Sequence, residues 1–223
     1  MQKRYLDEGQ QRQLLNAAKR CADTLAQRDY HWMSVLRDTG MRIQEFSKLT
    51  VPRVQRALQA GWLVSRKEHC KGKRKANEYL VTQGLAQHLQ ALVRISNELG
   101  AGVDLPDGQE QPLVWGRDIA GRACPLSVRS YQLRVKHWTQ VAGLDDRISP
   151  HWLRHTRAMN IMRRSRGSNP LKVCQLALNH ANLSSTGVYQ QLSREEFEAE
   201  LRAVDGGRMP KRQAVRLLEG AGA

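Results

Sequence analysis

The sequence predicts an α+β fold that is mostly α-helical and carries one small antiparallel sheet. Apolar residues recur at helical spacing over most of the 223 residues. In the middle of the chain two short runs, 61–68 and 77–82, have the composition of β-strands, and a basic connection joins them. Neighbouring strands with such a connection pair as a hairpin, so the sheet is expected to be antiparallel.

The chain is predicted to begin with three helices. Asp7 and Gln10 fit a capping box, and apolar residues at helical spacing extend the first helix to Leu25. Gly40 predicts the end of a second helix, because glycine adopts the left-handed conformation found there. The expected ranges are about 7–25, 30–38 and 43–49.

The middle of the chain has a mixed pattern. A third strand is expected near Val54–Leu58, although Pro52 weakens that prediction. A helix follows at about 85–99. Glycines and prolines then crowd residues 100–125, which we interpret as a surface loop with a short strand near 113–115.

The last third is predicted to be helical. Asn169 and Pro170 fit the N-cap and first position of one helix, and Ser193 with Glu196 fits a capping box for the last. The expected ranges are about 127–141, 151–163, 170–179, 185–191 and 193–204. We therefore expect one domain over 1–204 and a tail over 205–223 that starts with a flexible break.

The charge of the chain favours a polyanionic partner. Lys and Arg number 36 against 21 Asp and Glu, which gives a net charge of +15. Binding to a polyanion releases condensed counterions, so such an excess of positive charge favours nucleic acid. The alternative is a generally basic protein with no nucleic-acid role.

Other compositional features narrow the class of protein. The four cysteines are scattered without a C-x-x-C pair, which indicates reduced thiols rather than disulfides or a zinc ribbon. No signal peptide and no membrane-length apolar run is visible, so a soluble intracellular protein with no membrane partner is expected.

The segment ISPHWLRHTRA contains the first candidate site. His151 and His155 are four residues apart and would share one face of a helix, as in a zinc pair. A metalloprotease would have Glu where Trp152 stands, and no further ligand cluster is visible. Alternatively, both histidines cap and pack the start of a helix. Arg154 offers planar donors to a phosphate, or a surface salt bridge.

Three further segments carry candidate residues. Arg42 and Glu45 in TGMRIQEFSKL form either a phosphate clamp held by a carboxylate or an ordinary helix pair. Tyr189, which follows His180, is either a covalent nucleophile or an ordinary half-buried tyrosine. The tip of the predicted hairpin is basic and contains Lys71, Lys73, Arg74 and Lys75. Such a charged run is either solvated or in contact with DNA, and one of its lysines could also donate a proton.

Together the four segments resemble the tyrosine recombinase (phage integrase) family. The family pattern is T-G-[LM]-R-[IV]-x-E, a lysine in a G-K-G hairpin, P-H-x-L-R-H-[TS], L-G-H and a final tyrosine. The chain shows TGMRIQE, CKGKRK, PHWLRHT and LNHANLSSTGVY in that order, over about residues 3–204. The resemblance implies the catalytic-domain fold of that family.

The resemblance also implies roles in phosphate binding and chemistry. Arg42 and Arg154 would bind the scissile phosphate, and His180 would add a hydrogen bond to it. Tyr189 would attack phosphorus, with His151 as its proton-transfer partner. The result is a 3′-phosphotyrosyl intermediate, which requires no cofactor and no metal ion.

The remaining implied roles are proton donation, support and DNA contact. Lys71 would protonate the departing 5′ oxygen, with Lys73 as the alternative because Cys70 replaces the glycine before the lysine. Glu45 and His155 would support the catalytic groups. The candidate DNA-binding residues are Arg66, Lys67, Lys73, Arg74 and Lys75.

The chain departs from the family pattern in one further residue and in its domain layout. Asn179 stands where the family has glycine before the second histidine, and asparagine tolerates the left-handed conformation. No N-terminal core-binding domain is evident, so we expect either a minimal recombinase or a fragment of a longer protein. The last helix, with Phe197 and Leu201 on one side, either packs on its own domain or, as the resemblance implies, docks on a neighbouring protomer.

The function that the resemblance implies is site-specific breaking and rejoining of DNA strands. A recombinase-like DNA-binding regulator without chemistry and a type IB topoisomerase-like relaxing enzyme are the alternatives. The expected partners are double-stranded DNA, further copies of the chain on DNA, from dimer to tetramer, and accessory DNA-bending proteins. The expected location is the cytoplasm, at the nucleoid.

Overall fold

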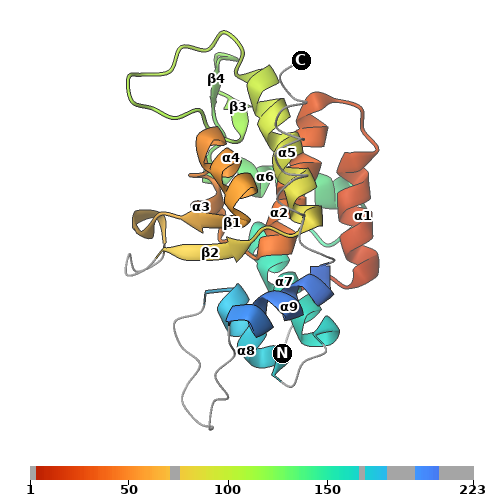
Figure 1. Cartoon of the computed structure of the whole chain (residues 1–223). Coiled ribbons are helices and arrows are strands. Elements are labelled where there is room, and N and C mark those ends of the chain that lie inside the picture. Colours follow the sequence, from red (N-terminus) through yellow and green to blue (C-terminus); the bar gives the residue numbers. More distant parts are fainter. Residues whose placement is uncertain (1–3, 71–75, 166–168, 180–193, 206–223) are drawn as a thin grey trace.

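The computed structural model describes residues 4–70, 76–165, 169–179 and 194–205, with the backbone alone for 194–196. Helices form most of the described part, and the two small hairpins lie at its edge (Figure 1). The expected α+β class is therefore confirmed. The predicted helix at 185–191 and the tail beyond Asp205 lie outside the described residues.

The helices follow one another through the chain with short connections. Their bounds are α1 Glu8–Lys19, α2 Thr24–Thr39, α3 Ile43–Phe46, α4 Val51–Ala60, α5 Gln83–Leu99, α6 Val128–Val141, α7 Pro150–Arg164, α8 Pro170–Ala177 and α9 Arg194–Asp205.

The predicted first helix was too long. The capping box of Asp7 and Gln10 forms as expected, but α1 ends at Lys19 rather than at Leu25. Asp23 starts α2 four residues later, because its carboxylate accepts a hydrogen bond from the N–H of Ala26. The apolar pattern continues across this break because both helices pack on the same core.

The predicted strand at Val54–Leu58 was wrong, because this segment lies inside helix α4. Pro52 occupies the first turn of α4, where a missing N–H costs nothing, and Gly61 ends the helix at φ 77°. The buried side chains Val54, Ala57 and Leu58 share one face at helical spacing.

The predicted hairpin is confirmed. Strands β1, Trp62–Ser65, and β2, Asn77–Leu80, are antiparallel, with Trp62 opposite Leu80 and Ser65 opposite Asn77. The short strand expected near 113–115 corresponds to β3, Trp115–Arg117, which pairs with β4, Ala123–Pro125, in a second hairpin. The sequence analysis did not predict β4, because its three residues carry too short a pattern to be recognised.

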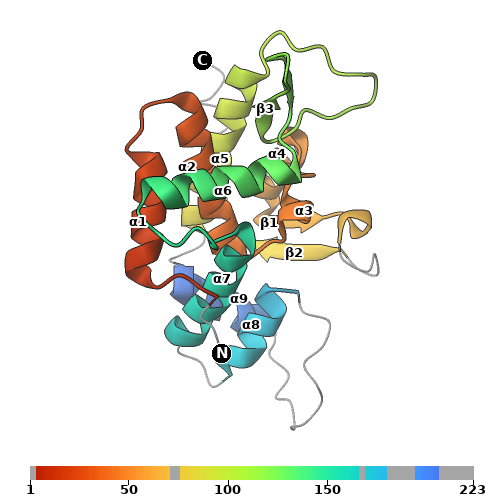
Figure 2. The same ribbon diagram turned by 180° about the vertical axis from the view of Figure 1, so that it is seen from behind.

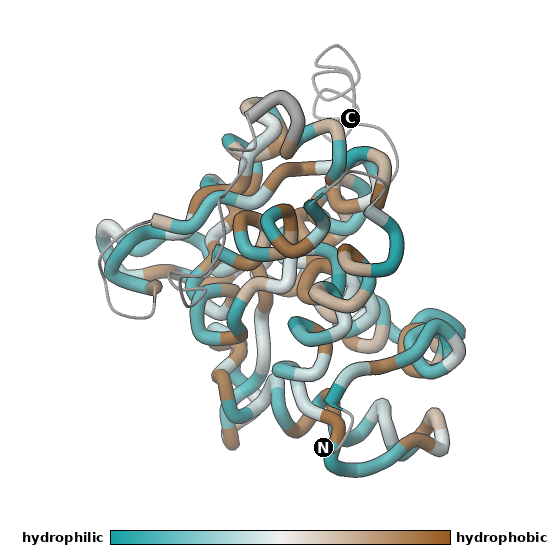
Figure 3. The backbone as a smooth tube through the Cα atoms, turned by 90° about the horizontal axis from the view of Figure 1, so that it is seen from below, coloured by the Kyte–Doolittle hydropathy of each residue, from teal (hydrophilic) through white to brown (hydrophobic). Residues whose placement is uncertain are grey.

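The core lies among the central helices. In Figure 3 hydrophobic, brown stretches alternate with hydrophilic, teal ones along the coils in the middle of the molecule. Trp32 and Tyr131 are buried and meet edge to face, with ring centroids 4.9 Å apart. This packing fixes α2 against α6, and α7 crosses below both helices (Figure 2).

The C-terminal helices form a smaller apolar cluster beside α7. Asn169 caps α8 as predicted, by accepting a hydrogen bond from the N–H of Lys172. On α9, Leu201 and Val204 are buried, and the ring of Phe197 stacks on Trp62 at 6.5 Å. Helix α9 therefore packs on its own domain in this structure.

Candidate functional site

Arg42 lies just before α3, where its side chain is held by a carboxylate. The expected pair with Glu45 forms, with 2.9 Å between Nη1 and Oε1. The Arg42 side chain remains 28% exposed, whereas Glu45 is 1% exposed. Among the described residues, only one of the five N–H groups of Arg42 is used, in this bond, so four remain for a ligand.

Glu45 connects the arginine to the first hairpin. Its second oxygen, Oε2, accepts hydrogen bonds from Asn77 Nδ2 at 2.9 Å and from the Tyr79 hydroxyl at 2.8 Å. Burial and the Glu45 charge raise the pKa of Tyr79, so the phenol keeps its proton and donates. Sequence reasoning missed Asn77 and Tyr79, since their contact with Glu45 joins segments more than 30 residues apart.

Arg154, on α7, is almost fully buried at 4% exposure. It donates hydrogen bonds to the carbonyl oxygens of Gly40, at 2.5 Å, and Leu178, at 2.7 Å. Burial and the nearby charge of Arg42 lower the pKa of Arg154, which still remains a cation at neutral pH. The two carbonyls fix the plane of the guanidinium, and with respect to the described residues three N–H groups remain for an anion.

The two backbone carbonyls that hold Arg154 come from helix ends. Gly40 ends α2 at φ 65°, and Leu178 ends α8. Asn179 follows at φ 51°, so the left-handed conformation expected where the family has glycine is confirmed. Helix C-termini carry partial negative charge, which stabilises the buried Arg154 cation.

A small pocket of about 200 Å³ brings three of the predicted catalytic residues together. Arg42, His151 and Arg154 all line it, between the start of α7, the start of α3 and α6. A pocket lined by two arginines and a histidine suits a tetrahedral anion such as phosphate.

His151 and His155 lie one helical turn apart on α7. Their rings meet edge to face with centroids 4.5 Å apart. Partial burial and the neighbouring positive groups lower the pKa of both, so each imidazole is neutral at neutral pH and able to accept a proton. Within the part of the chain that the structure describes, no group of three His, Cys, Asp or Glu side chains forms a metal cluster.

The other predicted catalytic residues, Lys71, His180 and Tyr189, lie outside the described residues. The same holds for Lys73, Arg74 and Lys75 at the hairpin tip. Cys70, just before that tip, is buried, and its thiol donates to the carbonyl of Arg66 at 3.3 Å.

A basic groove lies beside the first hairpin. Arg66 and Lys67, both predicted to contact DNA, line a groove of about 670 Å³ together with Arg53 and Arg56 of α4. Burial and the charge of Arg66 lower the pKa of Arg53, and its buried Nε has no hydrogen-bond partner among the described residues. Sequence reasoning missed Arg53 and Arg56, because α4 was predicted as a strand.

The sequence profile described as "Phage integrase family" matches residues 4–196 of the chain. The chain belongs to this family. It is 30% identical over 184 residues to tyrosine recombinase XerC of Shewanella amazonensis, and 32% identical over 191 residues to tyrosine recombinase XerD of Xanthomonas campestris pv. campestris. Each alignment covers 82% of this chain and 54% of the relative, so the chain spans about half the length of these relatives.

Solved structures of phage integrase family proteins share the fold. XerA recombinase matches 94% of this chain with a TM-score of 0.60 at 22% identity, and 68% of its own chain is covered. The Tn1549 transposon integrase in complex with transposon right end DNA matches 100% of this chain with a TM-score of 0.62 at 17% identity, again covering 68% of its own chain. The expected catalytic-domain fold is therefore confirmed. Over the described residues, no helix is long and apolar enough to cross a membrane.

Proposed function

We propose that the chain is the catalytic part of a site-specific DNA recombinase that breaks and rejoins strands through a 3′-phosphotyrosyl intermediate. The observation that carries the proposal is the pocket where Arg42, His151 and Arg154 meet. The order of the four motifs and membership of the phage integrase family support it. The two named relatives are tyrosine recombinases.

In the proposed cleavage step, the Tyr189 oxygen attacks phosphorus and the bond from phosphorus to the 5′ oxygen breaks. His151, neutral at neutral pH, takes the phenol proton, and Lys71 gives a proton to the departing 5′ oxygen. Arg42 and Arg154 stabilise the charge that gathers on the non-bridging oxygens.

The arginines are preorganised for this role. Arg154 is fixed by two carbonyls and Arg42 by Glu45, so neither side chain needs to reorganise when phosphate binds. His180 would add a further hydrogen bond to the phosphate, and His155 would support His151 through their ring contact.

The proposed substrate is double-stranded DNA, bound along the pocket and the basic groove. Arg66, Lys67, Arg53 and Arg56 would bind backbone phosphates there, with Lys73, Arg74 and Lys75 at the hairpin tip. Further partners in the proposal are other copies of the chain, from dimer to tetramer on DNA, and accessory DNA-bending proteins. The proposed place of action is the nucleoid in the cytoplasm.

A nicked suicide substrate tests the proposal. Because the fragment downstream of the nick is lost after cleavage, the phosphotyrosyl adduct accumulates and is counted on a denaturing gel. We expect an adduct with the native chain and none with Tyr189→Phe, whereas Tyr5→Phe retains it. An equal adduct from Tyr189→Phe would show that another residue is the nucleophile.

A further inference from the structure

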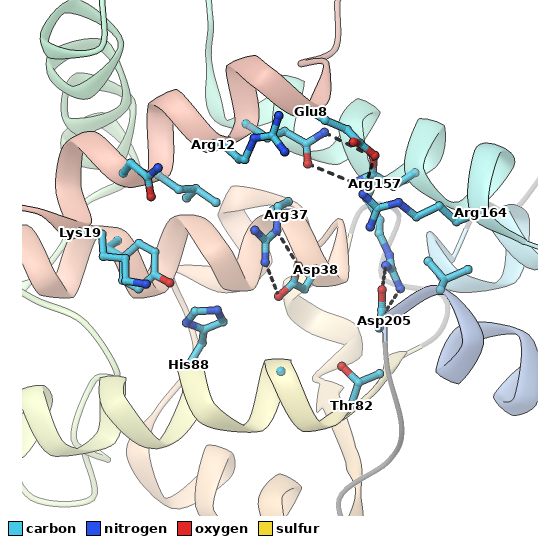
Figure 4. A pocket seen from close by; sticks show the side chains of 17 residues that line it. Glu8, Arg12, Lys19, Arg37, Asp38, Thr82, His88, Arg157, Arg164 and Asp205 are labelled. Atoms are coloured by element: carbon cyan, nitrogen blue, oxygen red, sulfur yellow. Dashed lines mark hydrogen bonds and ion pairs between the residues drawn. The ribbon is translucent and has the colours of Figure 1, made fainter.

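A second pocket lies on the other side of α7 from the candidate catalytic site. It has a volume of about 400 Å³ and lies among α1, α2 and α5, with α7 and the end of α9 at one end (Figures 1 and 4). The catalytic pocket borders α6 instead, which lies on the face seen in Figure 2. A volume of this size accepts a small molecule.

The lining of this pocket is positively charged. The cations are Arg12, Lys19, Arg37, Arg157 and Arg164, and the carboxylates are Glu8, Asp38 and Asp205. Three cations are paired within the pocket: Arg157 with Asp205, Arg37 with Asp38 and Arg164 with Glu8. Among the described residues Arg12 and Lys19 form no ion pair, so two positive charges are left for a ligand.

Arg157 leaves a polar atom unsatisfied at this pocket. The residue is 4% exposed, and both of its Nη atoms donate to Asp205, at 2.5 and 2.7 Å. Its Nε is buried and has no hydrogen-bond partner within the described part of the chain. A buried N–H without an acceptor is destabilising, so the Arg157 side chain carries an unfavourable contact beside this pocket.

The neutral lining suits a polar molecule rather than a simple ion. Gln11 and Asn160 share hydrogen bonds across α1 and α7 at 3.4 and 3.2 Å. At the far end, the rings of Tyr30 and His88 meet with centroids 5.4 Å apart. The pocket thus offers cations, amides and aromatic edges within one volume (Figure 4).

We propose that this pocket binds a small phosphorylated molecule. The arginine and lysine donors that line the pocket would bind the phosphate oxygens, and the amides and rings would contact the rest of the ligand. The binding does not depend on the recombinase activity proposed above, so it is measured without DNA.

The position of Arg157 connects this pocket to the catalytic arginine. A Cβ atom placed on Gly40 would lie 3.1 Å from Cγ of Arg157, so the Arg157 stem packs directly on Gly40. The carbonyl of Gly40 in turn accepts the hydrogen bond from Arg154. A ligand that shifts Arg157 would therefore shift the carbonyl that positions Arg154. This second step rests on the proposed function.

The binding test uses calorimetry of the full chain with AMP, pyrophosphate and adenosine as probes. We expect AMP to bind more tightly than pyrophosphate, and the Arg12→Ala/Lys19→Ala double variant to bind AMP at least tenfold more weakly. Arg12 and Lys19 are exposed, so the variant retains its fold. Arg20→Ala, which removes an exposed charge outside the pocket, is the matched control and leaves the affinity unchanged.

Several results would overturn the binding proposal. Among them are no binding of AMP, equal binding of adenosine, and an equal loss of affinity in Arg20→Ala. A short DNA duplex that displaces AMP from the native chain, but not after the double substitution, would identify DNA as the phosphate source and would also overturn it.

The coupling test measures adduct formation on the nicked substrate with and without saturating AMP. We expect at least a threefold change in rate for the native chain and none for the double variant. An unchanged rate in the native chain, despite measured binding, would overturn the coupling but not the binding. Failure of the recombinase proposal would appear instead as no adduct under any condition.

Discussion

Single residues determine how the candidate catalytic arginines are positioned. Arg42 depends on Glu45, and Arg154 depends on two backbone carbonyls rather than on a carboxylate. The first arrangement is visible in the sequence, because the partners are three residues apart. The second is not, because the hydrogen bond from Arg154 to Gly40 spans 114 residues and its acceptor is backbone, which every residue type carries.

Gly40 is the residue at which a small change is expected to have the largest effect on the site. In Gly40→Ala a Cβ would lie 2.4 Å from Cδ2 of Leu178 and 3.1 Å from Cγ of Arg157, and φ is 65°. We expect the free energy of unfolding to fall by about 2–4 kcal/mol. Adduct formation should fall more than tenfold, since the carbonyl that holds Arg154 moves.

Gly143→Ala is the control for backbone strain alone. Its φ is also 65°, but within the described part of the chain no atom beyond its two neighbours in sequence lies within 4 Å of the added Cβ. Urea unfolding should show a loss of only about 1 kcal/mol, and the adduct should form normally. Equal losses of stability and activity in both variants would show that strain, rather than the close approach of α7 and α8, dominates at Gly40.

At the scale of elements, the hairpin, α5 to α7 and the cap of α8 were predictable from the sequence. Their signals are local: a capping residue at Asn169, a helix-ending glycine and long apolar periodicity. Helix α4 was not predictable, because a ten-residue amphipathic segment with an early proline fits an edge strand as well as a helix. The basic groove was missed with it.

Helix α4 supplies a test of the basic groove. Burial and the charges of Arg66 and Arg56 oppose the positive charge of Arg53, whereas Glu110, 4.0 Å away, favours it. Because these effects oppose one another, Arg53→Gln should lower the free energy of unfolding by no more than about 1 kcal/mol. DNA binding should weaken. The slope of the logarithm of the binding constant against the logarithm of salt concentration should become smaller in magnitude by about one, which corresponds to one lost phosphate contact.

Fluorescence anisotropy at several salt concentrations measures this slope. Arg117→Gln on β3, an exposed arginine outside the groove, is the control and should retain the native slope. An unchanged slope in Arg53→Gln would place the DNA backbone elsewhere on the chain.

The contact between α2 and α5 is expected to make stability depend on pH. Nδ1 of His31 and Nδ1 of His88 lie 2.9 Å apart. Burial, His88, Arg94 and Lys19 lower the pKa of His31 to about 4, and burial lowers that of His88 despite Asp38. In the unfolded chain both titrate near 6.5, so below that pH the unfolded state binds more protons and the folded state loses stability.

The expected loss between about pH 6.5 and pH 4 is on the order of 1 kcal/mol, because water partly screens the pair. In His31→Gln the urea midpoint should fall less than in the native chain between these two pH values. His137→Gln, at an exposed histidine of α6, should leave it as in the native chain. A native midpoint that does not change over this range would exclude a neutral buried pair.

At the scale of the whole molecule, Asp29 connects elements that are far apart in sequence. Its carboxylate, 0% exposed, accepts hydrogen bonds from Arg28 and Trp32 on α2 and from Arg134 and Trp138 on α6. Arg28 also donates to the carbonyl of Trp115 on β3, at 2.6 Å. One buried charge thus holds α2, α6 and the second hairpin together.

Asp29→Asn keeps the size of the side chain but removes the charge that Arg28 and Arg134 share. An arginine left buried without its partner is strongly unfavourable, so the free energy of unfolding should fall by about 3–5 kcal/mol. Asp145→Asn, which breaks an exposed pair with Arg147, should leave the urea midpoint nearly unchanged. If both variants unfolded at the native midpoint, the charge of Asp29 would not be what holds α2 to α6, and apolar contacts such as Trp32 on Tyr131 would account for it.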